Sequence, residues 1–322
     1  MKEPLFLQPV LQEKIWGGVR LKEFGFDLES DKIGECWSIS AHKNGPAIIK
    51  NGAFAGENLA QVYKNQPQLF AGEKLKEFPL LTKILDANAW LSVQVHPDDN
   101  YAQKVEGEYG KTECWYIIDA KKDAEIIYGH TAETREELAC EMEKGEWETL
   151  LTRQPVKKGD FFYVPAGTMH AIGPGVLVLE TQQSSDVTYR VYDFDRPDEQ
   201  GKLRDLHIDK ALDVLTVPAK SFKNQGETEL FRDGKITHLL KSEFFNVDKW
   251  DIRGDLHFIK DYPYTLVTVI EGSGQIQIDT DSYPLVKGDS FILTSDIDKW
   301  IISGELELIA SGGNNSISLQ SV

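Results

Sequence analysis

Short hydrophobic runs alternate along the chain with turn-forming residues, a pattern that predicts mostly β-strands. The runs are rich in Val, Ile, Phe, Tyr and Thr and are bounded by Gly, Pro, Asn or Asp. Strands are expected at residues 36–40, 90–96, 114–118, 161–164, 176–180, 266–270 and 275–278. This density of strands and turns favours a β-barrel or a β-sandwich.

Helical patterns are confined to three segments, at residues 59–74, 134–150 and 209–215. The second has the pattern of an amphipathic helix, with Thr134 as the N-cap and with Glu136 and Glu137 in the first turn. We expect these helices to be insertions in a β core.

One stretch of the sequence occurs twice. Residues 156–172 and 285–301 align with Gly159 opposite Gly288, and both copies have Lys-Gly-Asp before a hydrophobic strand. Residues 218–234 are polar and lack hydrophobic periodicity, so they are predicted to form a linker. We therefore predict two related β units, at residues 1–222, which include the helical insertions, and 223–322.

Composition and charge narrow the class of protein. With 41% hydrophobic and 27% charged residues, the 322-residue chain is neither disordered, collagen-like nor a disulfide scaffold. A net charge of -17 makes nucleic acid and anionic membranes poor partners. The three cysteines form no CxxC pair, and the chain shows neither a signal-peptide pattern nor a long apolar run. These features predict a cytoplasmic protein.

Two of the seven histidines lie where they could bind a metal. Gln94 and His96 share one face of a strand, Glu113 lies on the next strand signal, and His170 follows the turn after Pro165. Gln94, His96, Glu113 and His170 would offer a mixed nitrogen and oxygen set, which suits Zn²⁺ and also Fe²⁺, Mn²⁺ or Co²⁺. A position for water or substrate would remain open.

Several motifs carry a resemblance to known families. The spacing of Gly159, Pro165, Gly167 and His170 resembles the second signature motif of the cupin superfamily, although Pro174 stands where that motif has Asn. The segments QVHPDD, GKTECWY and SSDVTYRVYDFDRP resemble, in that order, three motifs of type I phosphomannose isomerases, and KIWGG and GECWSIS are also similar. The resemblance implies a mainly β fold of two cupin-like (jelly-roll) β-barrels, of which the second is degenerate.

The resemblance also implies an activity and a ligand set. Type I phosphomannose isomerases interconvert mannose 6-phosphate and fructose 6-phosphate with one bound divalent metal, usually Zn²⁺. By this resemblance His96, Glu113 and His170 are the metal ligands, Gln94 is a fourth, and Arg190 is the active-site arginine. The expected partner is a hexose phosphate, and the expected assembly is a monomer or a homodimer.

The chemistry of an aldose to ketose isomerisation requires such residue types. A proton moves between C2 and C1 through a cis-enediol, and a metal or a fixed arginine can stabilise the negative charge that develops. Lys111 and Arg190 could supply cations for charged substrate groups. The base stays open among Lys111, Asp186, Glu35 and a metal-bound water.

Other residues have both a functional and a structural interpretation. Trp16 and Trp37 could form the wall of a sugar pocket, and core packing explains both equally well. Cys114 should face away from Glu113 and pack in the core. Asp98 and Asp99 are expected in a solvated turn after Pro97.

The second unit lacks the ligand set, because Lys299 stands where the first copy has His170. We expect it to be a structural or substrate-shielding unit without a metal site. Two other functions fit the sequence less well. A non-haem iron oxygenase would use the same ligands but leaves Lys111 and Arg190 unexplained. A non-catalytic sugar-binding cupin would not need an open metal position.

Overall fold

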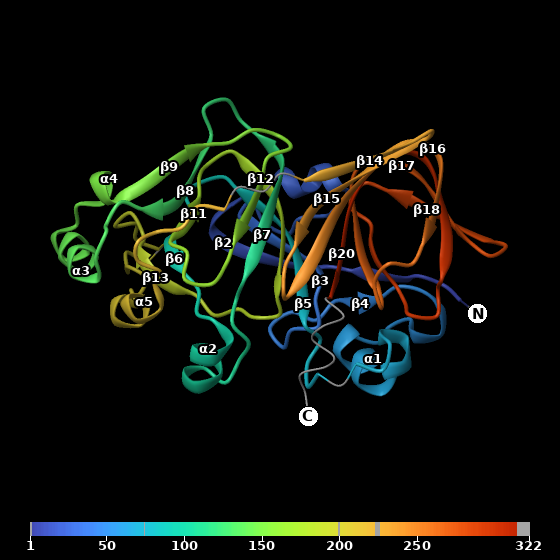
Figure 1. Ribbon diagram of the computed structural model, residues 1–322, viewed down its shortest axis with the longest axis horizontal. Helices are drawn as coiled ribbons and strands as arrows, with labels where there is room; N and C mark the ends of the chain where they lie inside the picture. Colours follow the sequence, from blue (N-terminus) through green and yellow to red (C-terminus); the bar gives the residue numbers. More distant parts are fainter. Residues whose placement is uncertain (1, 74, 199, 223–225, 314–322) are drawn as a thin grey trace.

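Strands dominate the computed structural model, which describes residues 2–73, 75–198, 200–222 and 226–313. They form two β units that lie side by side (Figure 1). The mainly β, cupin-like architecture is therefore confirmed. Within the described residues each unit is built from curved open sheets rather than from a closed ring of paired strands.

The first unit contains a six-stranded and a five-stranded sheet. The six-stranded sheet has the order β10-β7-β12-β5-β3-β2, with bounds Phe161–Val164, Glu113–Ala120, Val176–Gln183, Leu80–Ala87, Ile33–Ile39 and Val10–Gly18. The five-stranded sheet has the order β13-β6-β11-β8-β9, with bounds Tyr189–Tyr192, Val93–Val95, His170–Ile172, Glu125–His130 and Leu151–Pro155. A hydrophobic cluster that includes Trp115, Val178, Ile126 and Ile172 fills the space between them.

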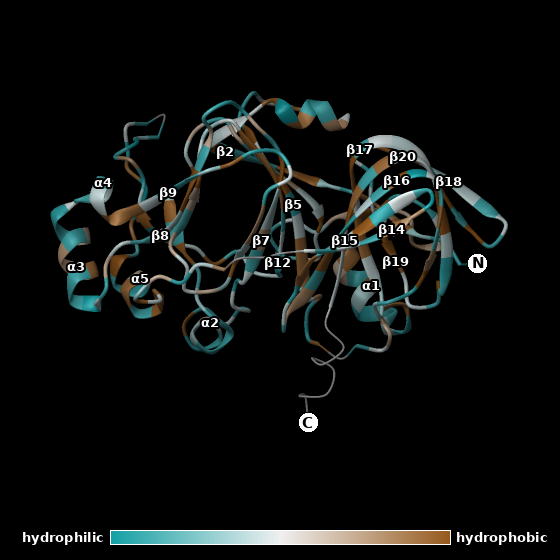
Figure 2. Cartoon of the chain, turned by 45° about the horizontal axis from the view of Figure 1, so that its top comes forward, coloured by the Kyte–Doolittle hydropathy of each residue, from teal (hydrophilic) through white to brown (hydrophobic). Residues whose placement is uncertain are grey.

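The centre of the six-stranded sheet is buried on both faces. Every residue of its middle strands β5 and β12 is buried, including the polar and charged ones, because both faces of these strands are covered. Because side chains alternate, Trp115 faces the interior of the first unit while Tyr116 faces the second unit. The two units therefore share a hydrophobic core, and hydrophobic segments follow the strands of both (Figure 2).

The second unit is one nine-stranded sheet. Its path is β14-β15-β16-β20-β17-β19-β1-β4, with bounds Glu227–Phe231, Gly234–Lys241, Phe245–Ile259, Lys299–Gly313, Thr265–Ile278, Ser290–Leu293, Leu5–Gln8 and Ile48–Ile49; β18 (Asp281–Val286) pairs with β17. Gly254, Gly304 and Gly274 lie in one row across three strands. A Cβ on Gly304 would lie 2.6 Å from the Ser273 carbonyl oxygen, so this row requires glycine where the strands approach closely.

Two segments of the N-terminal region belong to the second sheet. Strand β1 pairs with β19 through Leu5 and Ile292, and β4 pairs with β1. The division of the chain at residue 222 stays a prediction. The predicted linker is wrong in part, because β14 lies within residues 218–234 and pairs with β15; residues 223–225 lie outside the described residues. Strand β14 is exposed, so its pairing rather than burial makes it a strand.

The internal repeat appears as two turns with the same hydrogen bonds. Gly159 and Gly288 both have positive φ, at 91° and 98°. The N–H of Gly159 donates to the Ile117 carbonyl at 2.8 Å, and that of Gly288 donates to the Val269 carbonyl at 2.9 Å. In each copy the aspartate that follows accepts a backbone N–H from three residues earlier at 2.9 Å. These matching bonds align β7 with β17 and β10 with β19.

Short helices decorate the sheets. The helices are α1 (Leu59–Asn65), α2 (Asp99–Val105), α3 (Arg135–Lys144), α4 (Trp147–Leu150) and α5 (Ile208–Val214), and the 3-10 turns are η1 (Arg20–Phe24), η2 (Gly52–Phe54) and η3 (Pro67–Phe70). The predicted helix at 59–74 is shorter because α1 ends before Pro67, and Lys74 lies outside the described residues. The helix predicted at 134–150 divides at Gly145, which is left-handed, and Thr134 caps α3 as expected.

The structure corrects the prediction of a solvated turn at Asp98 and Asp99. These residues begin α2, because the side chain of Asp98 accepts a hydrogen bond from the N–H of Tyr101 and caps the helix. No helix in the described ranges has the length and hydropathy that crossing a membrane requires.

Candidate metal centre

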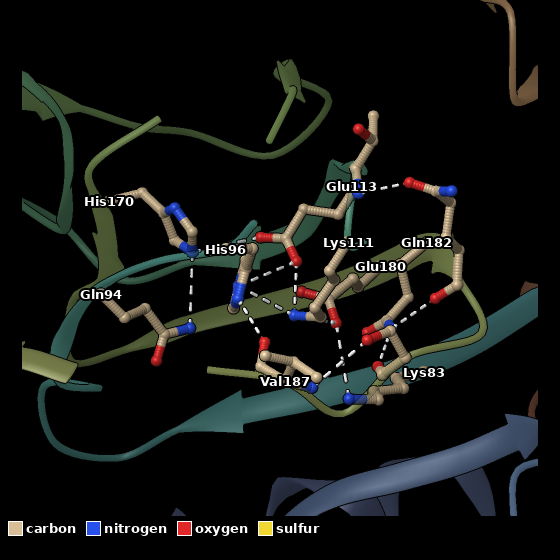
Figure 3. A network of polar contacts seen from close by, with 12 residues as sticks. Lys83, Gln94, His96, Lys111, Glu113, His170, Glu180, Gln182 and Val187 are labelled. Atoms are coloured by element: carbon tan, nitrogen blue, oxygen red, sulfur yellow. Dashed lines mark hydrogen bonds and ion pairs between the residues drawn. The ribbon is translucent and has the colours of Figure 1, made fainter. Parts of the chain in front are cut away.

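His96, Glu113 and His170 meet between the two sheets of the first unit (Figure 3). Glu113 begins β7 of the six-stranded sheet, His170 begins β11 of the five-stranded sheet, and His96 directly follows β6. One ligand atom from each lies within 4.8 Å of the others, and all three side chains are buried. We call these three residues the triad.

Backbone carbonyls orient both imidazoles. The Nδ1 of His96 lies 2.8 Å from the Val187 carbonyl oxygen, and the Nδ1 of His170 lies 2.9 Å from that of Thr168. A carbonyl only accepts hydrogen bonds, so Nδ1 carries the proton and the lone pair of Nε2 faces the triad. Burial and the charge of Lys111 lower the pKa of His96 well below its usual value and that of His170 to about 4. Both rings are therefore neutral near pH 7.

The donor set fits a divalent metal. The Nε2 of His170 lies 3.3 Å from Oε1 of Glu113, and the Nε2 of His96 lies 3.5 Å from Oε2. Such separations suit donors that each bind one ion at roughly 2.0–2.2 Å. Oε1 of Glu113 is buried and has no hydrogen-bond partner among the described residues, which is costly for an anionic oxygen. A bound cation would satisfy it.

Gln94 lies beside the triad. It pairs with His170 across β6 and β11, and its amide nitrogen is 3.4 Å from Nε2 of His170. Its amide oxygen accepts a hydrogen bond from Ser92 at 3.2 Å. Direct ligation by the oxygen would require the amide to turn over.

Lys111 brings a positive charge against the triad. Its ammonium donates to Nε2 of His96 at 3.0 Å and to Oε2 of Glu113 at 2.6 Å. Burial opposes its charge, but the carboxylates of Glu113 and Glu180 raise the pKa of Lys111 above its usual range. Lys111 is therefore an ammonium ion inside the protein.

A line of alternating charges extends from the triad toward the surface, and we call it the charge ladder. Its members are Glu113, Lys111, Glu180, Lys83, Glu35 and Lys14. After the 2.6 Å contact between Glu113 and Lys111, successive separations are 4.0, 3.8, 3.7 and 3.4 Å. Burial would raise the pKa of Glu35, but Lys83 and Lys14 lower it to about 2.

The sequence analysis missed Lys83 and Glu180. Both are buried, and Trp115 Nε1 donates to Glu180 at 3.0 Å. The signal that could have found them is a charged residue within a wholly buried strand, Lys83 in β5 and Glu180 in β12. A buried charge is costly unless it is paired, so such a position indicates a partner.

Arg190 lies on the same sheet face as Gln94, to which it pairs across β13 and β6. Its guanidinium donates to the Asp205 carbonyl at 2.7 Å, and it makes no ion pair with any described carboxylate. The nearby Asp193 is instead bound by Arg196 and Arg204. Burial and the charge of Arg204 lower the pKa of Arg190, and the charges of Asp193 and Asp205 only partly oppose this effect.

The remaining predicted site residues lie in three different settings. Glu35 belongs to the charge ladder. Trp16 is 4% exposed and packs in the cluster with Trp115. Asp186 is exposed and accepts a hydrogen bond from Asn44 at 3.0 Å, and no described contact joins it to the triad. Cys114 is buried on the opposite face from Glu113.

Comparisons with known proteins agree with this geometry. The family model for the catalytic domain of type I phosphomannose isomerase matches residues 5–124, and the model for the mannose-6-phosphate isomerase cupin domain matches residues 235–312. The chain is 54% identical to the mannose-6-phosphate isomerase of Streptococcus mutans, over 98% of this chain and 99% of that protein. It is 49% identical to the mannose-6-phosphate isomerase ManA of Bacillus subtilis, over 96% and 98%. A crystal structure of the mannose 6-phosphate isomerase from Bacillus subtilis superposes with a TM-score of 0.94 at 48% identity, covering 96% of this chain and 99% of that one.

Proposed function

We infer the reaction from one premise: this chain belongs to the type I phosphomannose isomerase family. We propose that it interconverts mannose 6-phosphate and fructose 6-phosphate through a cis-enediol. The observation that carries this proposal is the buried triad with the Lys111 ammonium against it. The relatives reported above are named as isomerases, so the oxygenase and the non-catalytic alternatives find no support among them.

The proposed cofactor is one Zn²⁺ ion held by His96, Glu113 and His170, with Gln94 as a fourth ligand. Two neutral imidazoles and a carboxylate are a set that zinc prefers at catalytic sites. When bound, the ion supplies Lewis acidity to the sugar oxygens near C1 and C2. The orphaned Oε1 of Glu113 and the Nδ1 hydrogen bonds of both histidines support this assignment.

In this proposal Lys111 and Arg190 each stabilise a different negative charge of the substrate. Lys111 is buried and protonated, so it donates hydrogen bonds to the oxygen on which charge develops. Arg190 has no carboxylate partner in the described chain, so it is free to form a bidentate contact with the substrate phosphate. Glu35 holds Lys83 in place from the surface side of the charge ladder. Trp16 and Asp186 as substrate contacts stay predictions.

The decisive experiment follows fructose 6-phosphate formation from mannose 6-phosphate and measures the metal content of the same protein. Chelation should abolish turnover, and Zn²⁺ should restore it. In His170→Gln the loss should exceed the roughly 10–100-fold seen when a partner of a ligand is removed, and metal content should fall. His257→Gln is the matched control, because His257 is exposed in the second unit. Full turnover in metal-free protein would contradict the proposal.

We also propose a compartment and an assembly state for the protein. The described cysteines are all free, which agrees with the cytoplasm as the predicted compartment. We keep a monomer or a homodimer as the predicted assembly, and light scattering after size-exclusion chromatography would decide between them.

A further inference from the structure

The second unit has a pocket at the place where the first unit has its triad. The repeated turns align the units, and strand register extends the alignment. Glu113 lies opposite Val164 in the first unit, and Thr265 lies opposite Leu293 in the second. Thr265 therefore occupies the position of Glu113.

The partner strands give the same correspondence. Gln94 pairs with His170, and Ile259 pairs with Lys299 at the equivalent bridge. Ile259, Thr265 and Lys299 therefore stand where the first unit has Gln94, Glu113 and His170, so these three metal-binding side chains are missing from the second unit. Ile259 and Thr265 nevertheless line a cavity of about 190 Å³, which we call the second-unit pocket.

Aromatic side chains contribute to the lining of the second-unit pocket. Trp250, Phe258 and Trp300 all line it. The ring centroids of Trp250 and Phe258 are 4.4 Å apart, and Phe258 and Trp300 are stacked at 5.6 Å with an interplanar angle of 8°. Three packed rings make a rigid apolar surface of the kind on which the C–H face of a ring can lie.

Polar side chains also belong to the lining. The Nδ1 of His238 lies 2.8 Å from Asp248, and its Nε2 lies 3.2 Å from Glu229. Tyr262 donates its hydroxyl proton to Asp248 at 2.6 Å. Asp261 also lines the pocket. The three carboxylates of the lining outnumber its two histidines, and two of them lie beside His238, so this lining is unfavourable for an anion.

One lining donor lacks an acceptor. Trp300 is 4% exposed, and its Nε1 is buried with no hydrogen-bond partner in the described part of the chain. A buried N–H without an acceptor costs stability, and a ligand oxygen would remove that cost. A ligand that fits this pocket would therefore accept one hydrogen bond from Trp300 and donate others to the carboxylates.

We propose that the second-unit pocket binds a neutral, hydroxyl-rich ring of the monosaccharide class. Hydroxyl groups both donate and accept, as the lining requires. An organic ammonium ion would only donate hydrogen bonds and would leave the N–H of Trp300 without an acceptor. The carboxylates would repel a sugar phosphate. The volume lies below the ~300–1,000 Å³ of pockets for drug-sized ligands, which suits a single ring.

Binding of methyl α-mannoside to the full chain tests this proposal, because this glycoside is neutral and cannot open to be isomerised. Saturation-transfer NMR should show saturable binding with a Kd on the order of millimolar. Trp300→Phe removes the N–H and should weaken binding by roughly 2–10-fold. Asp248→Asn should also weaken it. Trp147→Phe is the matched control, because Trp147 stacks on Tyr192 in the first unit.

Turnover of mannose 6-phosphate separates this pocket from the triad. Trp300→Phe should leave that turnover unchanged, and His170→Gln should leave glycoside binding unchanged. The proposal is overturned if the glycoside does not bind saturably, or if tetramethylammonium or inorganic phosphate binds in its place. It is also overturned if binding survives both pocket variants but is lost in His170→Gln. Because the readout is binding, failure here leaves the proposed reaction untouched.

Discussion

At the scale of single residues, the first unit concentrates charge where water is excluded. The triad and the charge ladder place carboxylates and ammonium groups in alternation, so each buried charge has an opposite neighbour. Removing one member leaves its partner buried and unpaired, which costs more than the pair itself contributes. Residues of this network should therefore respond strongly to substitution.

Glu113→Gln keeps the shape of the side chain and removes its charge. Metal binding should fall because the carboxylate ligand is lost, and turnover should drop by at least about 100-fold, since a metal supplies several kcal/mol of charge stabilisation. Isothermal metal titration and the isomerase assay check both effects. Glu271→Gln removes an exposed glutamate of the second unit and should change neither. Equal metal affinity in the two variants would refute the ligand role.

The pH dependence of the free energy of unfolding should reveal the ionisation of Glu35. Its pKa is about 2 in the folded protein and about 4.5 ordinarily, so its carboxylate stabilises the fold above pH 4.5. That contribution, roughly 3 kcal/mol, is lost as pH falls from 4.5 toward 2. Wild type should lose this much more free energy of unfolding than Glu35→Gln over the same range, measured by urea denaturation. Parallel curves for the two proteins would show that Glu35 is not held as an anion.

At the scale of elements, local sequence signals set where helices begin, and close backbone approach sets how the strands bend. Thr134 caps α3 through the N–H of Glu137, and left-handed Gly145 ends it. The row of Gly254, Gly304 and Gly274 lets three long strands approach without side chains between them.

Thr134→Ala should lower the free energy of unfolding by about 1 kcal/mol, because an N-cap oxygen is lost. Thr134→Ser keeps that oxygen and serves as the control. Urea denaturation of the three proteins measures the difference. A serine variant as unstable as the alanine variant would mean that the methyl group, rather than the cap, is what matters.

Gly304→Ala should destabilise more than Gly25→Ala. Both glycines have positive φ, but a Cβ at Gly25 meets no atom within 4 Å, whereas at Gly304 it meets the backbone of Ser273 and Gly274. The overpacking adds roughly 1–3 kcal/mol to the conformational cost that both share. Thermal unfolding of the pair checks the ranking. Equal losses would mean that the strands can move apart.

At the scale of the whole molecule, the two units depend on each other. The outer face of the six-stranded sheet, with residues such as Tyr116 and Leu179, is buried in one cluster with Phe245 and Leu266 of the second unit. Strand β1 from the N-terminus also completes the second sheet. Neither unit buries its hydrophobic surface alone.

A chain that ends at residue 222 should therefore not fold cooperatively. It would expose the outer face of the six-stranded sheet and leave β1 without β19. Circular dichroism during urea denaturation and the isomerase assay test this, with the full chain as control. A soluble, active fragment with a sharp unfolding transition would show that the units are independent.

Much of this organisation could be predicted from residues close in sequence. The alternation of apolar residues indicated the strands, the repeated Lys-Gly-Asp turn indicated the two related units, and Thr134 indicated the start of a helix. Lys83 and Glu180 could not be assigned a role, because their partners are distant in the chain and only strand pairing brings them together. The start of α2 was missed because the Asp98 cap was interpreted as a turn.

The strand period, the repeat and the residue types that could bind a metal depend on neighbours along the chain, so the amino-acid sequence alone indicates them. Which of these residues meet depends on how the strands pair and pack. Glu113 and His170 begin strands of two different sheets, and His96 follows a third strand. The charge ladder crosses between strands, and the second-unit pocket lies where repeat-related positions converge. Such contacts depend on sheet register and packing, which no local pattern specifies.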